Sequence, residues 1–340
     1  MKLLIVTQAV DSEDPILGFF VRWIEELAKQ VERVEVVCLR EGKHTLPANV
    51  RVYSLGKERR SASSLVYAIR FKKLVWQLRR DYDAVFVHMN QEYILIGGWL
   101  WKLLGKRIYL WRNHYAGSWL TDVAAAFCVK VFCTSKRSYT AKYKKTVIMP
   151  VGVDTERFFP DAKTARKPRS ILFFSRMSPS KRPEMLLEAL KLLAERGVEF
   201  SADFYGSPLP KDQSYYDELV KKADTPDLKR RVSFYPSIPN DQAPGLYRTH
   251  EIFVNASPSG MLDKTIFEAA ASGCIVLAAS ADFAESAGET SHFNSVRELA
   301  DRIESILTHP SGQPSSDLIE HNSLHALVSR LTEELALGKS

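Results

Sequence analysis

Two cations, Arg176 and Lys181, are the residues best placed for chemistry in this chain. They follow residues 170–175, a short apolar segment whose composition predicts a buried strand. Ligands of open α/β sheets bind beyond the carboxyl ends of the strands. A guanidinium there can hold an anion such as a phosphate bidentately, and an ammonium can hold it as a point charge. A solvated basic loop remains the alternative.

A second candidate lies in residues 251–279, which predict a strand, a turn, a helix and another strand. The predicted helix, residues 263–271, has its apolar residues on one face and ends at Gly273. Unpaired amides and the helix dipole at such an N-terminus attract phosphate. Glu268 lies one to two turns into this helix, where it could accept a hydrogen bond from a ribose. A purely structural unit with a solvent-facing Glu268 is the other interpretation, and both stay open here.

The predicted strands and helices alternate in both halves of the chain, which favours an α/β protein with doubly wound parallel sheets. The polar, proline-punctuated residues 156–168 predict a linker. The expected organisation is therefore a domain over 1–155, the linker, a domain over 169–315 and a last helical segment over 316–340. The predicted strands are 2–7, 33–39, 50–53, 84–88, 107–111, 129–134, 146–150, 170–175, 201–205, 232–235, 251–255 and 275–278. The predicted helices are 19–30, 64–80, 93–104, 118–126, 183–196, 214–223, 243–248, 263–271, 295–307 and 318–337.

Composition narrows the class of protein. The chain has 340 residues and a net charge of +7, which favours anionic partners. The cysteines are widely spaced in apolar contexts, so we expect reduced core thiols in a cytoplasmic protein without a signal peptide or membrane span. The basic residues form no patch interleaved with aromatic residues, so no nucleic-acid partner is expected. The four cysteines are Cys38, Cys128, Cys133 and Cys274.

Five motifs in order give the chain a resemblance to the retaining glycosyltransferases of GT-B type, family 4, over nearly its whole length. The motifs are Gly18 after the first strand, His114 in Trp111-Arg-Asn-His-Tyr, Gly152-Val-Asp-Thr-Glu-Arg-Phe158, Ser175-Arg176-Met-Ser-Pro-Ser-Lys181 and Phe267-Glu268-Ala-Ala-Ala-Ser-Gly273. The resemblance implies two Rossmann-like domains with a cleft between them, and a last helix that crosses back toward the first domain. One position departs from the family: Gly260 stands where the family has the first Glu of Glu-x7-Glu. Asp263 is the candidate to replace part of its role.

The resemblance also implies the substrates and the site. The donor would be a nucleoside diphosphate sugar, UDP- or GDP-linked, with no metal and no other cofactor. Cations and amides of the second domain would stabilise the leaving diphosphate. The implied catalytic residues are His114, Arg176, Lys181 and Asp263. The implied donor-binding residues are Gly18, Arg176, Lys181, Tyr235, Gly260, Met261, Leu262 and Glu268, and the acceptor-side candidates are His88, Asn90, Arg112 and Asn113.

The acceptor is left open by the resemblance: a glycan, a lipid-linked compound or a small molecule, as in cell-envelope polysaccharide biosynthesis. Residues 64–80 predict a helix with an apolar stripe, and its other side is basic. Peripheral contact with the inner face of a membrane through this basic domain is one interpretation, and a helix packed on the sheet with a solvated basic face is the other. The stripe is Tyr67, Phe71, Leu74 and Leu78, and the basic residues are Arg70, Lys73 and Arg80.

Two rival functions are compatible with the same residues. One is a nucleotide-sugar hydrolase or epimerase of the same fold. The other is a catalytically silent subunit that binds nucleotide sugars, which Gly260 keeps open because the family's first Glu is missing there.

Overall fold

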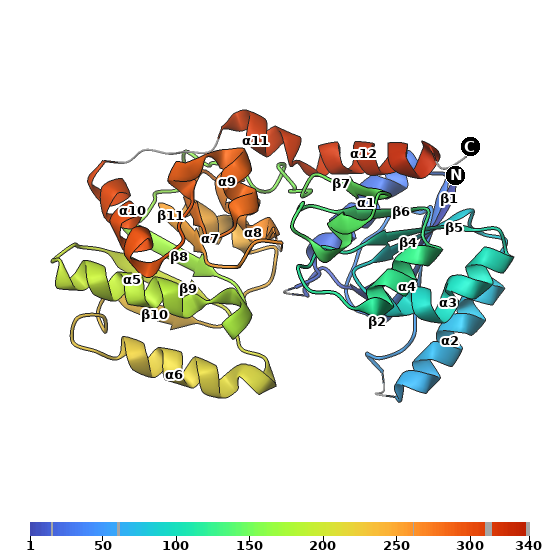
Figure 1. Ribbon diagram of the computed structural model, residues 1–340, viewed down its shortest axis with the longest axis horizontal. Coiled ribbons are helices and arrows are strands. Elements are labelled where there is room, and N and C mark those ends of the chain that lie inside the picture. Colours follow the sequence, from blue (N-terminus) through green and yellow to red (C-terminus); the bar gives the residue numbers. More distant parts are fainter. Residues whose placement is uncertain (15, 60–61, 261, 310–314, 338–340) are drawn as a thin grey trace. The chain divides into compact units, whose positions relative to one another are not determined.

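The computed structural model describes residues 1–14, 16–59, 62–260, 262–309 and 315–337, and these form two compact units (Figure 1). Unit 1 comprises Met1–Pro150 with Leu324–Ser340, and unit 2 comprises Val151–Ser323. Both contain a parallel sheet with helices on its two faces, which confirms the predicted fold class. No helix in the described ranges is long and apolar enough to cross a membrane.

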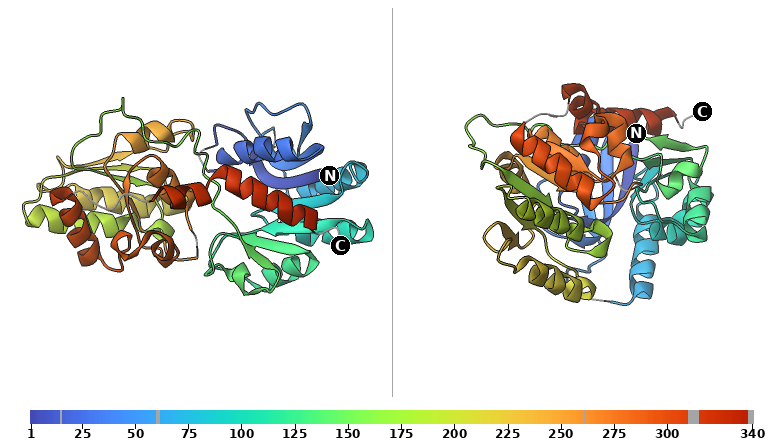
Figure 2. Two further views of the ribbon diagram at one scale, coloured as in Figure 1. Left: turned by 90° about the horizontal axis from the view of Figure 1, so that it is seen from above. Right: turned by 60° about the vertical axis from the view of Figure 1, so that its left-hand side comes forward.

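Unit 1 is built on a seven-stranded sheet with the order β3-β2-β1-β4-β5-β6-β7. Helices α1 and α12 cover one face, and α2, α3 and α4 cover the other. Figure 2 shows α12, in red, alongside α1 on this sheet. The strands are β1 (Lys2–Val10), β2 (Arg33–Glu41), β3 (Val50–Ser54), β4 (Ala84–His88), β5 (Arg107–Trp111), β6 (Lys130–Cys133) and β7 (Thr146–Ile148). The helices are α1 (Phe19–Gln30), α2 (Ser64–Gln77), α3 (Glu92–Leu103), α4 (Trp119–Phe127) and α12 (Leu324–Leu337).

Unit 2 is built on a five-stranded sheet with the order β10-β9-β8-β11-β12. Helices α5, α6 and α10 contribute to the core on one face, and α7, α8, α9 and α11 to the core on the other. The strands are β8 (Ser170–Phe174), β9 (Ser201–Tyr205), β10 (Val232–Tyr235), β11 (Ile252–Asn255) and β12 (Ile275–Ala278). The helices are α5 (Pro183–Glu195), α6 (Gln213–Ala223), α7 (Ala243–Arg248), α8 (Lys264–Ala271), α9 (Ala281–Ala287), α10 (Val296–Thr308) and α11 (Ser316–His321).

The structure differs from the expected domain boundaries at both ends of unit 2. Residues 156–168 do not form a separate linker, because Phe158 is buried and the Arg166 guanidinium donates to the carbonyls of His250 (2.6 Å) and Ser272 (2.8 Å). Residues 318–337 form two helices rather than one. The break lies at Asn322. Its side-chain nitrogen donates to the Leu318 carbonyl (2.9 Å), and its side-chain oxygen accepts from the backbone amide of Val151 (3.2 Å).

All four cysteines are buried, and within the described residues none of them forms a disulfide, as expected for core thiols. Gly273 has a φ of +84° and closes α8, which confirms its predicted role at the end of that helix.

Candidate active site

The strand order of unit 2 reverses its direction at β8. The chain runs from β8 to β9 on one side, whereas β11 pairs with β8 on the other side. Loops that leave two neighbouring parallel strands in opposite directions open a crevice at their carboxyl ends. The loop after β8 carries Arg176 and Lys181, and the loop after β11 carries residues 256–260 and 262–263. The sequence-predicted cations therefore lie at the position where such sheets bind ligands.

Lys181 and Asp263 are brought together in this crevice. The Lys181 ammonium lies 2.7 Å from both carboxylate oxygens of Asp263 and 3.3 Å from the Ser257 hydroxyl. Ser257 donates to the same carboxylate at 2.5 Å, and the Asn255 amide donates to it at 3.1 Å. The Lys181 side chain is 11% exposed. Ser257 and Asn255 were not predicted as site residues, because only the fold shows that they surround Asp263.

The ionisation of Asp263 reflects these contacts. Burial raises the pKa of a carboxyl group, but the positive charge of Lys181 and the hydrogen bonds from Lys181, Ser257 and Asn255 hold the pKa of Asp263 below its ordinary value. A carboxyl group with a lowered pKa stabilises the fold above its unfolded-state pKa, and this stabilisation disappears as the pH falls through the folded-state value.

We therefore expect Asp263→Asn to destabilise unit 2 by about 3 kcal/mol at neutral pH, because the substitution leaves the Lys181 charge without its partner. The difference from wild type should begin to shrink as the pH falls below about 3.9, the ordinary pKa of an aspartate, and should keep shrinking as the pH falls through the lowered pKa of the folded protein, where the wild-type carboxyl group also takes up a proton. Thermal unfolding followed by far-UV circular dichroism from pH 7 to pH 2.5 measures this. Asp224→Asn is the matched control, since it removes a solvent-exposed pair with Lys229. A difference that stays constant with pH would contradict the role of the ion pair.

Arg176 is a half-buried cation at the start of the loop after β8. Within the described residues its guanidinium makes no hydrogen bond and no ion pair. A half-buried guanidinium without a carboxylate is suited to bind an anionic ligand.

Arg182 joins the two loops of the crevice. Its backbone is left-handed, with a φ of +49°, although it is not glycine and precedes Pro183. Such a conformation costs on the order of 1–3 kcal/mol and persists only where neighbouring contacts hold it. Here the Arg182 Nε donates to the Ala256 carbonyl in the loop after β11 at 2.9 Å. This contact holds the turn that carries Lys181 next to the turn that carries Ser257.

Glu268 of α8 is buried among other charged side chains and does not face solvent. It is 4% exposed, and the Tyr247 hydroxyl donates to its carboxylate at 3.4 Å. Burial raises the pKa of Glu268, and the positive charges of Lys264 and Arg157 oppose this effect. Burial also disfavours the charged form of Lys264, one helical turn earlier, and therefore lowers the pKa of its ammonium group. The interpretation of Glu268 as a solvent-facing residue is therefore wrong.

The turn before α8 does not offer all the amides that the sequence suggested. Gly260 has a φ of +85°, and its amide donates to the buried carboxylate of Asp282 at 2.8 Å. That amide is occupied within unit 2, so it is not open to a phosphate. Leu262 is buried in the apolar core on this side of the sheet, and Met261 lies outside the described residues.

Tyr235 provides an open aromatic surface at the carboxyl end of β10. Its ring stacks on that of Tyr205 in β9, with centroids 4.5 Å apart and planes 17° apart. The Tyr235 side chain remains 36% exposed. An exposed ring in this position could stack with a planar ligand such as a nucleotide base.

In unit 1, the structure explains Gly18 and His88 by the fold rather than by a binding site. A Cβ atom on Gly18 would lie 2.6 Å from the Asp14 carbonyl and 2.8 Å from the Ser12 carbonyl, so the loop itself requires glycine. His88 is 2% exposed, and its ring stacks on Phe20 with centroids 3.9 Å apart and approaches the Thr7 hydroxyl at 3.3 Å. His88 therefore lies in the core and does not present an acceptor-facing surface.

The loop after β5 carries three further candidates. The His114 Nδ1 accepts from the Ala116 amide at 2.9 Å, so a neutral His114 ring carries its proton on Nε2. The Asn113 side-chain oxygen accepts from the Thr134 amide (3.2 Å) and the Ser138 hydroxyl (3.0 Å), which fixes the loop on β6. The Arg112 Nη2 donates to the Ala116 carbonyl at 3.0 Å, whereas its buried Nε has no hydrogen-bond partner among the residues that the structure describes.

Asn90 lies half-buried at the end of β4, after Met89, whose φ is +67°. The unit 1 candidates thus follow the neighbouring strands β4 and β5. Across the described residues, no group of three or more His, Cys, Asp or Glu side chains has the arrangement of a metal site.

Two different family models match the two units of the chain. Residues 168–309 match the family Glycosyl transferases group 1, and residues 14–138 match the family Glycosyl transferase 4-like. Mannosylfructose-phosphate synthase of Agrobacterium fabrum is 25% identical over 147 residues, which cover 40% of this chain and 32% of the relative. Digalactosyldiacylglycerol synthase 2 of Arabidopsis thaliana is 26% identical over 214 residues, which cover 60% of this chain and 41% of the relative. The chain therefore spans less than half the length of these relatives.

Among solved structures, Anabaena HepE, determined in complex with UDP and glucose, is similar with a TM-score of 0.76. It is 19% identical in sequence, and the match covers 99% of each chain. This likeness extends the match in fold to both units.

Proposed function

Because the chain belongs to the GT-B glycosyltransferases of group 1, we propose that it transfers a sugar from a nucleoside diphosphate sugar to an acceptor, with retention of configuration and without a metal. The observation that carries this proposal is the pair of cations, Arg176 and Lys181, beside β8 at the point where the sheet order reverses. The bond between the sugar C1 and the phosphate oxygen breaks, a bond from C1 to the acceptor oxygen forms, and the proton of the acceptor hydroxyl passes to the leaving diphosphate. Negative charge then grows on the leaving diphosphate, and the two cations stabilise it.

The other residues take roles that follow from their environments. Tyr235 stacks with the base, and Glu268 accepts from the ribose. Asp263, whose carboxylate faces Lys181, turns to the sugar hydroxyls when the diphosphate takes over the ammonium. His114 donates from Nε2 to a sugar hydroxyl, and Asn90, Arg112 and Asn113 serve the acceptor. HepE was solved with UDP, so UDP-sugars are the first donors to test before GDP-sugars.

The class of acceptor has two precedents in the names of the relatives. One relative is named for a sugar phosphate product and another for a glycolipid. We propose a sugar, sugar phosphate or lipid-linked hydroxyl as the acceptor, at a cytoplasmic site of synthesis such as that of cell-envelope polysaccharide.

Donor binding provides the direct test. We expect a saturating UDP-sugar, at about 100 times its Kd, to stabilise the wild-type protein by about 2.7 kcal/mol. Arg176→Ala should weaken binding about 10- to 100-fold, because it removes a charge-assisted contact to the diphosphate. Thermal shift across UDP, GDP and their sugars measures both effects. Arg230→Ala, at an exposed arginine of unit 2, is the matched control. Equal ligand-induced shifts in both variants would refute the donor site.

Two rival functions can be distinguished from sugar transfer by their reaction products. A hydrolase or epimerase of this fold would release free sugar from the donor without an acceptor. A silent binding subunit, which Gly260 keeps open because this position lacks the family's carboxylate, would bind the donor but turn over none of it across an acceptor panel. Mass spectrometry of the products distinguishes these outcomes from transfer to an added acceptor.

A further inference from the structure

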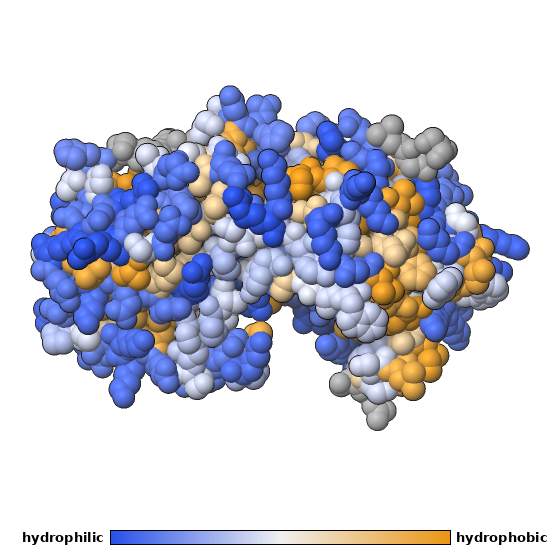
Figure 3. Space-filling view, in the orientation of Figure 1, coloured by the Kyte–Doolittle hydropathy of each residue, from blue (hydrophilic) through white to orange (hydrophobic). Residues whose placement is uncertain are grey.

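The outer side of α2, α3 and α4 in unit 1 is unusually apolar for a solvent-exposed surface. More than half of the exposed large apolar side chains in the described residues lie on these three helices. Single exposed apolar residues are normal, but a contiguous group marks an interaction site. Figure 3 shows apolar residues, in orange, over this part of unit 1. We call this surface the apolar face: Leu65, Val66, Ile69 and Trp76 on α2, Trp99 and Leu103 on α3, and Trp119, Leu120 and Val123 on α4.

The apolar face is separate from the side of α2 that packs on the sheet. Phe71, Val75 and Leu78 are buried in the core, and they follow one another at helical spacing. Leu65, Ile69 and Trp76 repeat with the same spacing but point to the opposite side. The stripe recognised in the sequence is thus the packed side, and α2 carries a second apolar stripe that is exposed to solvent.

The tryptophans divide in the same way. Trp76, Trp99 and Trp119 are 51%, 73% and 70% exposed, and all three lie on the apolar face. The remaining tryptophans of the chain, at positions 23, 101 and 111, are buried. Trp99 also contacts Phe127 of α4 edge-on, with ring centroids 5.2 Å apart, and this contact joins α3 and α4 into one surface. Indole rings with an apolar body and a polar N–H favour the boundary between water and lipid.

The charges around the apolar face are mostly positive. Helix α2 contains Arg70, Lys72 and Lys73 and no acidic residue, and Arg79 and Arg80 follow it. Helix α4 contains one acidic residue, Asp122, whose carboxylate is held by Tyr143 (2.5 Å) and Lys142 (2.7 Å). A second copy of this chain would bring the same positive charges against it. The complementary partner is therefore both apolar and anionic.

We propose that unit 1 docks on an anionic lipid bilayer through the apolar face, with Trp76, Trp99, Leu103 and Trp119 inserted at the headgroup boundary and the basic residues of α2 contacting lipid phosphates. Such binding scales with the buried apolar area and with attraction to anionic lipid. The inference does not depend on the sugar-transfer reaction, since it uses none of the residues proposed for the donor.

Vesicle sedimentation tests the proposal. The wild-type chain should bind vesicles that contain phosphatidylglycerol at least about tenfold more tightly than vesicles of phosphatidylcholine alone, and added salt should weaken this binding. Trp99→Ser/Leu103→Ser and Lys72→Glu/Lys73→Glu should each reduce binding at least about tenfold. The matched controls on α6 are Val220→Ser and Lys221→Glu/Lys222→Glu, which should bind as wild type does. Each variant is first checked for wild-type thermal unfolding.

Fluorescence provides a second readout. Lipids brominated near the headgroup should quench part of the tryptophan emission, and Trp76→Phe/Trp99→Phe/Trp119→Phe should abolish that quenching. Absence of wild-type binding to anionic vesicles would overturn the proposal, and so would equal losses in the α6 controls. A wild-type dimer in solution that Trp99→Ser/Leu103→Ser converts to a monomer would also overturn it, because a second copy would then cover the apolar face.

Discussion

Lys181→Ala should reduce the turnover of a nucleoside diphosphate sugar about 10²- to 10³-fold, the loss typical for a preorganised group that stabilises developing negative charge. The Lys181 ammonium is largely withdrawn from water and fixed by Asp263 and Ser257, so its orientation is set before the donor arrives. The measurement is release of the nucleoside diphosphate at saturating donor, with the acceptor identified by product analysis.

This variant could also lose activity by unfolding, because it leaves the Asp263 carboxylate buried without its cation. The double variant Lys181→Ala/Asp263→Asn removes both charges and should recover much of the lost thermal stability. If Lys181 acts on the leaving group, the double variant stays as slow as Lys181→Ala. Recovery of turnover together with stability would instead assign Lys181 a purely structural role. Lys191→Ala, at an exposed lysine of α5, is the control for a charge change nearby.

The position of Arg176 and Lys181 directly after β8 could be predicted from the sequence, because it depends on one short strand. Parallel strands buried on both faces are continuous apolar runs, so β8 could be recognised from residues 170–174 alone. Strands β4, β5 and β12 have the predicted bounds for the same reason. Strands β9 and β10 also have the predicted bounds, although each contains a polar residue. Once the strands alternate with helices, the residues that follow each strand fall at the edge where ligands bind.

What the sequence could not predict are contacts between distant segments. Asp263 looked like the first residue of a helix, and only the pairing of β8 with β11 brings it to Lys181. His88 ends a strand, as ligand-binding residues often do, but the rings of Phe20 and Trp23 from α1 enclose it. In both cases the chain neighbours carry no sign of the partner, because the partner belongs to another element.

Helix α2 shows a different limit. Its apolar stripe over Tyr67, Phe71, Leu74 and Leu78 was read correctly as one face of a helix, yet only Phe71 and Leu78 of that set are fully buried. Periodicity identifies an apolar face but not what covers it. A helix with apolar residues on two faces therefore requires the structure to show which face packs on its own sheet.

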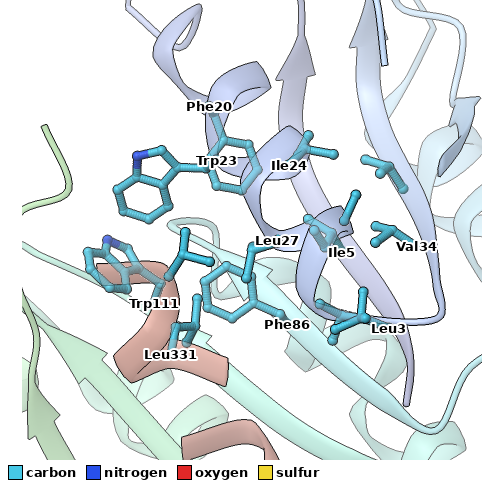
Figure 4. Close-up of a cluster of buried hydrophobic side chains, with 14 of the residues drawn as sticks. Leu3, Ile5, Phe20, Trp23, Ile24, Leu27, Val34, Phe86, Trp111 and Leu331 are labelled. Carbon is cyan, nitrogen blue, oxygen red and sulfur yellow. The ribbon is translucent and has the colours of Figure 1, made fainter. Parts of the chain in front are cut away.

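The helix at the end of the chain leads to the second large expected effect. In α12, Leu324, Leu327, Leu331 and Leu335 are buried in the core shared with α1 and the sheet of unit 1. Figure 4 shows Leu331 close to Trp111, Leu27 and Phe86, which come from β5, α1 and β4. The docking is reinforced at its edge, where the Arg107 guanidinium donates to the Leu335 carbonyl at 2.7 Å. A segment far along the sequence thus completes the first compact unit.

Leu331→Ala should accordingly destabilise unit 1 by about 2–5 kcal/mol, because it removes buried methyl groups and leaves a cavity beside Trp111. All tryptophans of the chain lie in unit 1, so their fluorescence follows the unfolding of that unit alone. The fluorescence transition should fall by about 5–15 °C, whereas the stabilisation of unit 2 by a bound donor should persist. Leu103→Ala, at a leucine that is 84% exposed, should change the transition little. A Leu331→Ala transition equal to that of Leu103→Ala would mean that α12 does not pack on unit 1, and that the first unit folds without the end of the chain.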